Sequence, residues 1–566
     1  MKSFLAVALA GCVAAGSLLT AHAETQVTTG PLSGGEDLAA ALAFEQRMGD
    51  LSLQQGKAVA VDLDASGHVV GTGGWGDSGL WTGVYGGGQA MRLAVARTHL
   101  AQALAGRHGH DADHPDNGKH LGTDGEDDPV EFWTGQRDEA LSRLQTILTA
   151  EHRDIVIAQD WQGTLHVPTA NPSGYPAGGD KHLADFGGGV IPGEAGMIMR
   201  ACTPVGLGPL GIGNPTMNPA NPTENNSNRV FQITWKHGDG RTYNCETSPS
   251  RDTYAGLTFG LLTAYDLLGS DLPELKAQIR TDLVSMGNFL YKYGWCYPRP
   301  HGYVSAKHDF DGFISPLFVQ VPMARLNLTN AVRHVLADGG DATEKTKWDG
   351  IWAAEFASQG AELAPSLEID SLQPNDGYYK FNLHHLTGFN LLRTTTGAEH
   401  TLIAQAFAVM DKTTGDDLNA HFEAITYGLT GEPARLAGAV THLRQWREYK
   451  AGVEAGTPVR NSSRCGHGLT CVPKDQYGVI TPAGEVDYFP GTSNQLRANL
   501  PLPVVERAPS DFLWQREPTI LDSAEPATHR EPAIDYLTPY WMIRYFTEVA
   551  PPALTPLPAW AGPAHV

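Results

Sequence analysis

The feature of this sequence that most restricts its fold is a long succession of segments with helical periodicity, joined by short connections. In one of them, Tyr254, Leu257, Leu261, Tyr265 and Leu268 share one helical face, a spacing typical of an amphipathic helix. The pattern predicts helices beginning near residues 36, 80, 137, 252, 274, 313, 346, 378, 400, 418, 435 and 535. Twelve helices in sequence predict six helical hairpins arranged in a ring.

Two regions interrupt the helical pattern without marking a domain boundary. Residues 151–250 are rich in Gly, Pro and Asn, and residues 455–532 are rich in Pro; we expect both to be long loops, which are often functional in compact domains. Between residues 62 and 67 the acids resemble the start of a calcium loop. The glutamate such a loop needs is replaced by Gly73, which favours a β-hairpin turn. The sequence therefore predicts one all-α domain over residues 24–566, with minor β-hairpins.

The N-terminus is typical of a bacterial secretory signal peptide over residues 1–23. Lys2 precedes an apolar run, and Ala21-His22-Ala23 supplies small residues before a cleavage point after Ala23. A lipoprotein with its lipid on Cys12 is the alternative. Elsewhere no apolar run of about 20 residues occurs, so no membrane span is expected. These observations predict a secreted or periplasmic protein.

The charge of the chain argues against nucleic-acid binding, and its cysteines predict disulfides. The chain has 62 acidic and 40 basic residues, a net charge of −22, and no basic cluster of the kind that nucleic-acid binding requires. In an oxidising compartment we expect Cys465 to pair with Cys471, and two of Cys202, Cys245 and Cys296 to form a second disulfide.

Several predicted helix starts combine acidic, aromatic and amide residues. For any single acid, capping of the helix N-terminus is the simplest explanation. Capping does not require Trp, Tyr, His and Arg beside the acid, so the repeated pattern favours a functional site. The segments are GDSGLWTGVY with Asp77 and Trp81, CETSPSRDTYAG with Glu246, Arg251 and Asp252, NDGYYKFNLHH with Asp376, Tyr379, Asn382, His384 and His385, and GDDLNAHF with Asn419 and His421.

These helix starts, WTGVY and DTYAG above all, resemble those of (α/α)6-toroid carbohydrate-active enzymes. WTGVY is similar to inner-helix starts in unsaturated-glucuronyl hydrolases and related glycosidases. The stretch from about residue 370 to 546 is similar to uncharacterised secreted bacterial proteins. The resemblance implies an (α/α)6 toroid whose inner helices present acids and aromatics to a central cleft that binds a poly- or oligosaccharide.

Glycoside hydrolysis is the first mechanism that fits these residues. It requires one protonated carboxyl group as acid and one ionised carboxylate as base or nucleophile. The candidates are Asp252 or Glu246 from one helix start, with Asp376 or Asp77 from another. Arg251 is expected either to hold Asp252 ionised or to bind a substrate carboxylate.

β-Elimination by a polysaccharide lyase is the second mechanism. It requires a group that neutralises the uronate carboxylate, a base and an acid. Asn382 with His385 and Tyr379, or Asn419 with His421, supply these residue types. A packed or surface histidine remains the simpler explanation for each.

Sugar binding favours aromatic platforms, for which Trp81 and Trp514 are candidates, and Arg516 can add hydrogen bonds. Residues 108–120 hold four histidines and three aspartates that suit zinc or another divalent ion, but their spacing matches no metal motif. No cofactor is therefore predicted, and a divalent metal at this loop is the alternative. The leading hypothesis is a glycoside hydrolase. The alternatives are a polysaccharide lyase and a periplasmic glycan-binding protein without catalysis.

Overall fold

The computed structural model describes most of the predicted helical body of the chain. The described residues are 30–105, 129–160, 165–166, 190–191, 193–212, 232–246, 249–269, 272–292, 295, 321–364, 378–454, 471–473, 478–480, 486–488, 496–498, 501–507, 514, 518 and 528–558. The predicted signal peptide lies outside them. No helix within these residues is both long and apolar enough to cross a membrane.

The described residues are mostly helical, as predicted, and a helix lies at or near each of the twelve expected positions. The helices are α1 (Gly35–Arg47), α2 (Ser78–Leu104), α3 (Pro129–Gln159), α5 (Arg251–Leu267), α6 (Pro273–Lys292), α7 (Val321–Ala337), α8 (Ala342–Gln359), α10 (Tyr379–Thr394), α11 (Gly397–Thr414), α12 (Ala420–Thr430), α13 (Pro433–Glu454) and α14 (Ile534–Arg544). Short π-helical turns, Met48–Ser52 and Tyr545–Val549, extend α1 and α14.

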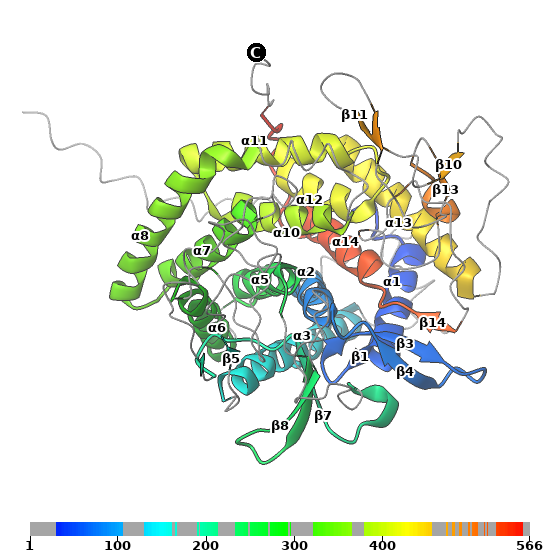
Figure 1. The fold of residues 1–566 in the computed structure, drawn as a ribbon. Coiled ribbons are helices and arrows are strands. Elements are labelled where there is room, and N and C mark those ends of the chain that lie inside the picture. The colour runs from blue at the N-terminus through cyan, green and yellow to red at the C-terminus, as the bar shows by residue number, and fades with distance from the viewer. Residues whose placement is uncertain are drawn as a thin grey trace, which may run out of the picture.

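Six of these helices contact one another in a closed cycle. α2 packs on α5, α5 on α7, α7 on α10, α10 on α12, α12 on α14, and α14 returns to α2. Each also contacts at least one helix of a second set, which comprises α3, α6, α8, α11, α13 and α1. Figure 1 shows α8 and α11 along the outer edge of the helical body, with α7, α10 and α12 inside them.

The six helices of the cycle run parallel, so their N-termini lie at the same end. In five neighbouring pairs, residues at similar positions along the two helices meet, whereas α7 and α10 are parallel but offset, with Met323 against Gly388 and Asn330 against Thr394. The contacts are Gly79–Thr253 (α2–α5), His334–Asp266 (α7–α5), Asn330–Thr394 (α7–α10), Asn382–His421 (α10–α12), Gly428–Phe546 (α12–α14) and Val84–Thr538 (α2–α14).

α2 and α5 approach unusually closely because glycines face each other across their contact. A Cβ atom at Gly83 would lie 2.1 Å from the carbonyl oxygen of Gly256, and one at Gly260 would lie 2.3 Å from that of Gly83. The run of three glycines at 86–88 remains helical, although glycine disfavours helices by roughly 1 kcal/mol per residue. Tertiary packing therefore outweighs local propensity here.

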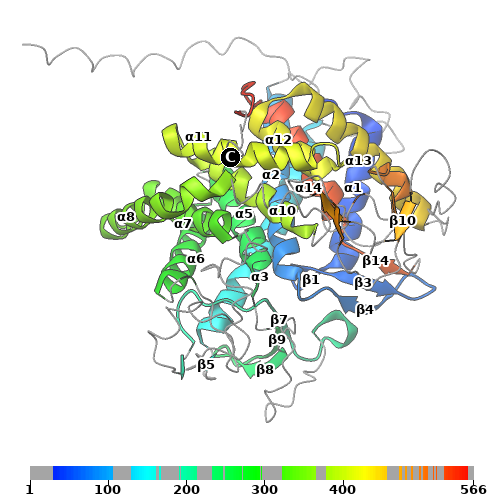
Figure 2. The ribbon, with the colours of Figure 1, turned by 45° about the horizontal axis from the view of Figure 1, so that its top comes forward.

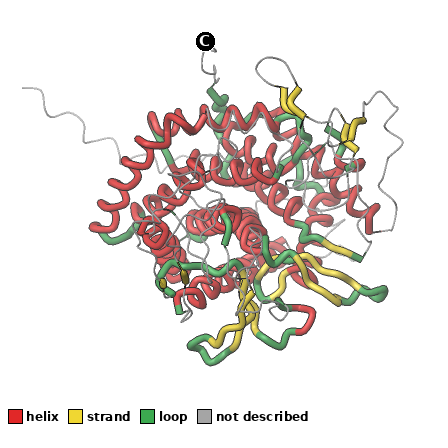
Figure 3. The backbone as a smooth tube through the Cα atoms, viewed as in Figure 1, coloured by secondary structure: helices red, strands yellow, loops and turns green. Residues whose placement is uncertain are grey.

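In Figures 1 and 3 the two three-stranded sheets lie at the lower edge of the helical body, whereas β10, β11 and β13 lie near its upper right edge. Figure 2 shows β7, β8 and β9 together, away from β10. The two three-stranded sheets have the orders β14-β3-β4 and β7-β9-β8, and the others are pairs. The strands are β1 (Leu53–Gln54), β2 (Lys57–Ala58), β3 (Ala60–Leu63), β4 (Val69–Gly73), β5 (Leu165–His166), β6 (Val190–Ile191), β7 (Ala201–Pro204), β8 (Gln232–Lys236), β9 (Thr242–Glu246), β10 (Cys471–Pro473), β11 (Gly478–Ile480), β12 (Val486–Tyr488), β13 (Leu496–Ala498) and β14 (His529–Arg530).

Two expectations about irregular regions can be compared with these strands. The hairpin turn after residue 62 is confirmed: β3 pairs antiparallel with β4, and the Asp64 carboxylate accepts hydrogen bonds from the backbone of Ser66 and His68. Residues 151–250 contain more regular structure than predicted, because α3 continues to Gln159 and β7, β8 and β9 form a sheet.

A disulfide joins Cys202 to Cys245 across β7 and β9, where the two residues are direct partners in the strand register. This confirms that two of the three central cysteines pair. Cys296 and Cys465 lie outside the described residues. The Cys202 backbone is also bound to α3, because its N–H donates to the Asp154 carboxylate and its carbonyl accepts from Arg153. The disulfide therefore lies in a strand already anchored to a long helix.

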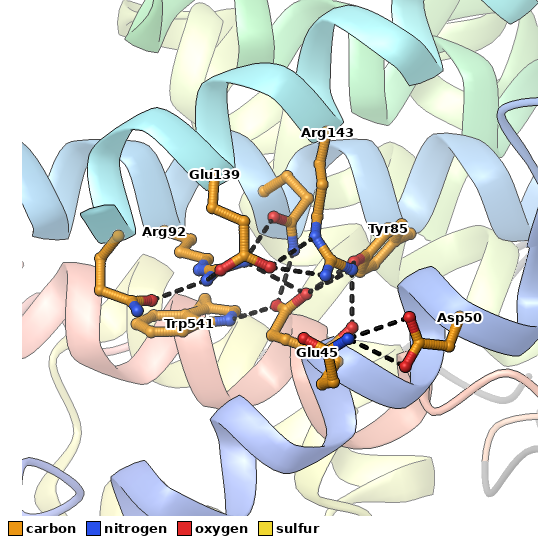
Figure 4. Close-up of polar contacts among 10 residues, drawn as sticks. Glu45, Asp50, Tyr85, Arg92, Glu139, Arg143 and Trp541 are labelled. Carbon is orange, nitrogen blue, oxygen red and sulfur yellow. Dashed lines mark hydrogen bonds and ion pairs between the residues drawn. The ribbon is translucent and has the colours of Figure 1, made fainter. Parts of the chain in front are cut away.

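A buried ionic network ties four helices together around Glu45, whose side chain is 1% exposed (Figure 4). Its carboxylate accepts hydrogen bonds from Tyr85 at 2.6 Å and Trp541 at 2.8 Å. Arg92 and Arg143 lie 3.4 and 3.5 Å from it. These partners belong to α2, α3 and α14, so one carboxylate of α1 fixes the positions of three other helices.

Replacement of Glu45 by Ala should lower the free energy of unfolding by about 3–5 kcal/mol, because the two arginines would lose a buried counter-charge. Urea denaturation measures this change. Glu36→Gln is the matched control, since Glu36 is exposed on the same helix and should alter stability by no more than about 0.5 kcal/mol. Equal stability of the two variants would contradict the structural role of Glu45.

The Cys202→Ser/Cys245→Ser variant should be less stable by about 2–4 kcal/mol, because the disulfide closes a loop between residues 43 positions apart. Thermal unfolding of the variant and of the oxidised parent gives this difference. A reducing agent should lower the melting temperature of the parent and leave that of the variant unchanged. An unchanged parent would show that this disulfide contributes nothing to stability.

Candidate active site

Two aspartates lie at the adjacent N-termini of α2 and α5. α5 is capped by Ser250, whose hydroxyl accepts the Thr253 N–H in a reciprocal capping box, so Asp252 is not the N-cap. Asp77 directly precedes α2 but makes no capping hydrogen bond with its side chain. Capping, the simplest explanation for an acid at a helix start, therefore accounts for neither carboxylate.

Arg200 holds the carboxylate of Asp77 from the side of the β-sheet. Its guanidinium lies 3.2 Å from Asp77 Oδ1. The backbone of Arg200 is fixed in turn, because its N–H donates to the carbonyl of Glu246 at 2.8 Å. The Cys202–Cys245 disulfide is two residues further along β7. The backbone contact with the sheet therefore fixes the position of Arg200 beside Asp77, at the start of α2.

The carboxyl group of Asp252 differs electrostatically from that of Asp77. Burial raises the pKa of Asp252 above its usual range, and the negative charge of Asp77 raises it further. Arg251 and Arg200 oppose these effects. Asp77 is partly exposed and ion-paired with Arg200. Burial and the charge of Asp77 thus favour the protonated form of Asp252 more than that of an ordinary aspartate, whereas Asp77 is held in an ion pair.

Three other predicted residues surround this pair. Glu246 ends β9 and is buried, and its backbone is the strand partner of Ala201. Arg251 is the first residue of α5 and is also buried. Trp81 is 4% exposed and packs so closely on the backbone that a Cβ at Gly74 would touch its ring. Trp81 is therefore a packed residue here and does not present the open sugar platform that we expected.

A second group of predicted residues lies where α10 and α12 begin. The Nε2 atom of His421 is 3.0 Å from Asn382 Oδ1. His385 bonds through Nδ1 to the carbonyl of Phe381 at 2.7 Å, and its ring stacks on Phe422. The structure therefore brings Asn382 and His385 of one predicted lyase set together with His421 of the other.

Both imidazoles are held in the neutral form. Burial lowers the pKa of His421 to about 3 and lowers that of His385 well below its usual value. A neutral imidazole that donates through one nitrogen leaves a lone pair on the other. Those atoms, His421 Nδ1 and His385 Nε2, are buried without a hydrogen-bond partner. These two nitrogens can accept a proton or hydrogen bond, but the protein encloses them.

The remaining candidates near α10 and α12 have structural contacts. Asn419 is the N-cap of α12, since its side-chain oxygen accepts the backbone N–H of His421; capping therefore explains its place at this helix start, and its role in substrate binding stays a prediction. Trp514 is fully buried against the His421 ring and offers no open platform. Tyr379 is 38% exposed at the start of α10, which makes it accessible to a ligand.

Other predictions fall outside the described residues. Asp376, Arg516 and the histidine-rich loop His108–His120 are among them, as is the signal peptide. Within the described ranges, no group of three or more His, Cys, Asp or Glu side chains could hold a metal ion. The metal hypothesis for residues 108–120 therefore stays a prediction.

Arg200 is the residue of this site that sequence reasoning missed. It lies in a Gly- and Pro-rich region that predicts loops, more than 120 residues from Asp77 in the chain. No local pattern marks it. The one signal near it is Cys202, whose pairing with Cys245 places Arg200 beside the strand that leads into α5.

Comparisons of the chain with protein-family models, with curated proteins and with solved structures each find no match. The geometry of the site therefore carries the functional argument.

Proposed function

We propose that this protein is a carbohydrate-active enzyme that hydrolyses glycosidic bonds in a poly- or oligosaccharide. Asp252 acts as the general acid, and Asp77 is the second carboxylate. The observation that carries this proposal is the placement of Asp77 and Asp252 at adjacent helix N-termini, with the pKa of Asp252 raised by burial and by Asp77. Paired acids in unlike environments are the requirement of this chemistry.

An (α/α)6 toroid is the architecture that we infer for the twelve helices. Six parallel helices in a closed cycle of contacts, each with a neighbour from the second set, support it. In this arrangement all six inner N-termini open at one end. Asp77, Asp252, Asn382 and His421 would then surround the same mouth, because each lies within or just before the first turn of an inner helix.

The proposed reaction uses the two carboxyl groups in turn. Asp252 donates its proton to the glycosidic oxygen as the bond to the anomeric carbon breaks. The ionised carboxylate of Asp77, ion-paired with Arg200, either takes a proton from the attacking water or bonds to the anomeric carbon itself. Water completes the reaction in both cases, and the distance between the carboxyl groups with substrate bound decides which occurs.

A polysaccharide lyase that uses Asn382, His385 and His421 is the second candidate. The observation in its favour is that both imidazoles are neutral, as a base must be. Their unpartnered nitrogens are enclosed, whereas Asp77 is partly exposed. We therefore place hydrolysis first.

Asp252→Asn and Asp77→Asn should each reduce kcat by about 10²–10⁴-fold while leaving substrate affinity similar, because the amides keep size and polarity but cannot transfer the proton. Release of reducing ends from a panel of neutral and uronate-containing polysaccharides measures this, with ultraviolet absorbance of unsaturated uronates followed in parallel. Asp138→Asn is the control, since Asp138 is exposed on α3. Full activity of Asp252→Asn, or a rise in absorbance with turnover, would contradict hydrolysis by this pair.

The pH profile should show activity falling as the pH rises through the raised pKa of Asp252, since the acid is functional only while protonated. This basic limb should lie above the range of an ordinary aspartate. Arg200→Met should move the limb to higher pH, because Arg200 lowers the pKa of Asp252. Initial rates between pH 3 and 9 test both statements. A limb that moves to lower pH in Arg200→Met would refute the assignment of Asp252.

A further inference from the structure

The described residues contain four buried arginines, and one of them has no partner. Arg92, Arg507 and Arg544 each donate hydrogen bonds to carboxylate, amide or carbonyl oxygens. Arg251 is just as buried, at 5% exposure, yet it makes no hydrogen bond or ion pair with any described residue. Its Nε atom is enclosed without an acceptor, whereas its two terminal nitrogens are not enclosed in this way.

This position is unfavourable for a cation unless an anion binds there. Burial of an unpaired charge is costly. Arg251 is also the first residue of α5, where the helix dipole and the free N–H groups favour negative charge. Two effects therefore oppose Arg251 in the unliganded protein, and a bound anion would offset both.

The charges next to Arg251 do not remove this requirement. Arg200, the other cation of the site, is already paired with Asp77. Asp252 is adjacent in sequence, and Arg251 acts on its carboxyl group without a hydrogen bond between them. A guanidinium with accessible terminal nitrogens presents a planar fork that matches an anionic oxygen group in two parallel hydrogen bonds.

We propose that Arg251 binds an anionic oxygen group of the ligand, so that the site next to Asp77 and Asp252 takes an acidic sugar unit in preference to a neutral one. That the ligand is a sugar rests on the proposed function, whereas its negative charge is inferred from Arg251 alone. A carboxylate and a sulfate ester share the required chemistry, and the experiment below separates them.

The test is isothermal titration of the full-length protein with D-glucuronate, D-glucose 6-sulfate and D-glucose in low salt. The parent should bind at least one of the two anionic sugars about 10-fold or more tightly than glucose, and the tighter of the two identifies the group. Arg251→Met should lose that preference, and Arg251→Lys should retain part of it. Arg137→Met, at an exposed arginine on α3, should bind as the parent does.

The melting temperature separates a binding role from a structural one. Arg251→Met should melt at the same temperature as the parent or higher, because it removes an unpaired buried charge. An anion preference that persists in Arg251→Met, a parent that binds all three sugars equally, or a large drop in melting temperature would each overturn the inference. Hydrolysis of neutral glycans without anion preference would refute Arg251 alone, whereas anion binding without any turnover would refute only the proposed hydrolysis.

Discussion

The close packing of α2 against α5 is the contact on which the candidate site depends. Gly83, Gly256 and Gly260 bring the two backbones together because no side chain separates them. The helices are parallel, so the same contact aligns their first turns and places Asp77 near Asp252. A pair of helices held apart by larger side chains would have separated these carboxyl groups and removed the mutual effect that raises the pKa of Asp252.

The side chains of the site come from two kinds of element, helices and a small sheet. The helices supply the acids, and a small disulfide-linked sheet supplies the cation that pairs with one of them. Farther along α2, the network around Glu45 pairs its buried charges with one another. The charges of that network are paired, whereas Arg251, which is also buried, has an Nε atom without an acceptor among the described residues.

Periodicity predicted the helices well where one face is buried, as in α6, whereas α2 and α14 are buried on nearly all sides. It predicted α2 despite its three glycines, for which only the neighbouring helix provides a reason. The sequence pattern could not distinguish the roles of Asp252 and Asn419, because both lie at helix starts with polar neighbours. In the structure Asn419 caps α12, whereas Ser250 caps α5 and Asp252 does not. The role of Arg200 could not be predicted from the sequence, because only the tertiary structure brings its side chain to Asp77 from a distant segment.

The cycle of helices closes between its earliest and latest members, since Thr538 of α14 donates to the carbonyl of Val84 in α2 across 454 residues. α1 packs on α14 as well. During synthesis α2 and α5 can pair early, but the opposite flank of α2 must wait until almost the whole chain has emerged. Contacts of such sequence separation slow folding. The flank of α2 that α14 covers therefore stays without this partner until the last helix is available.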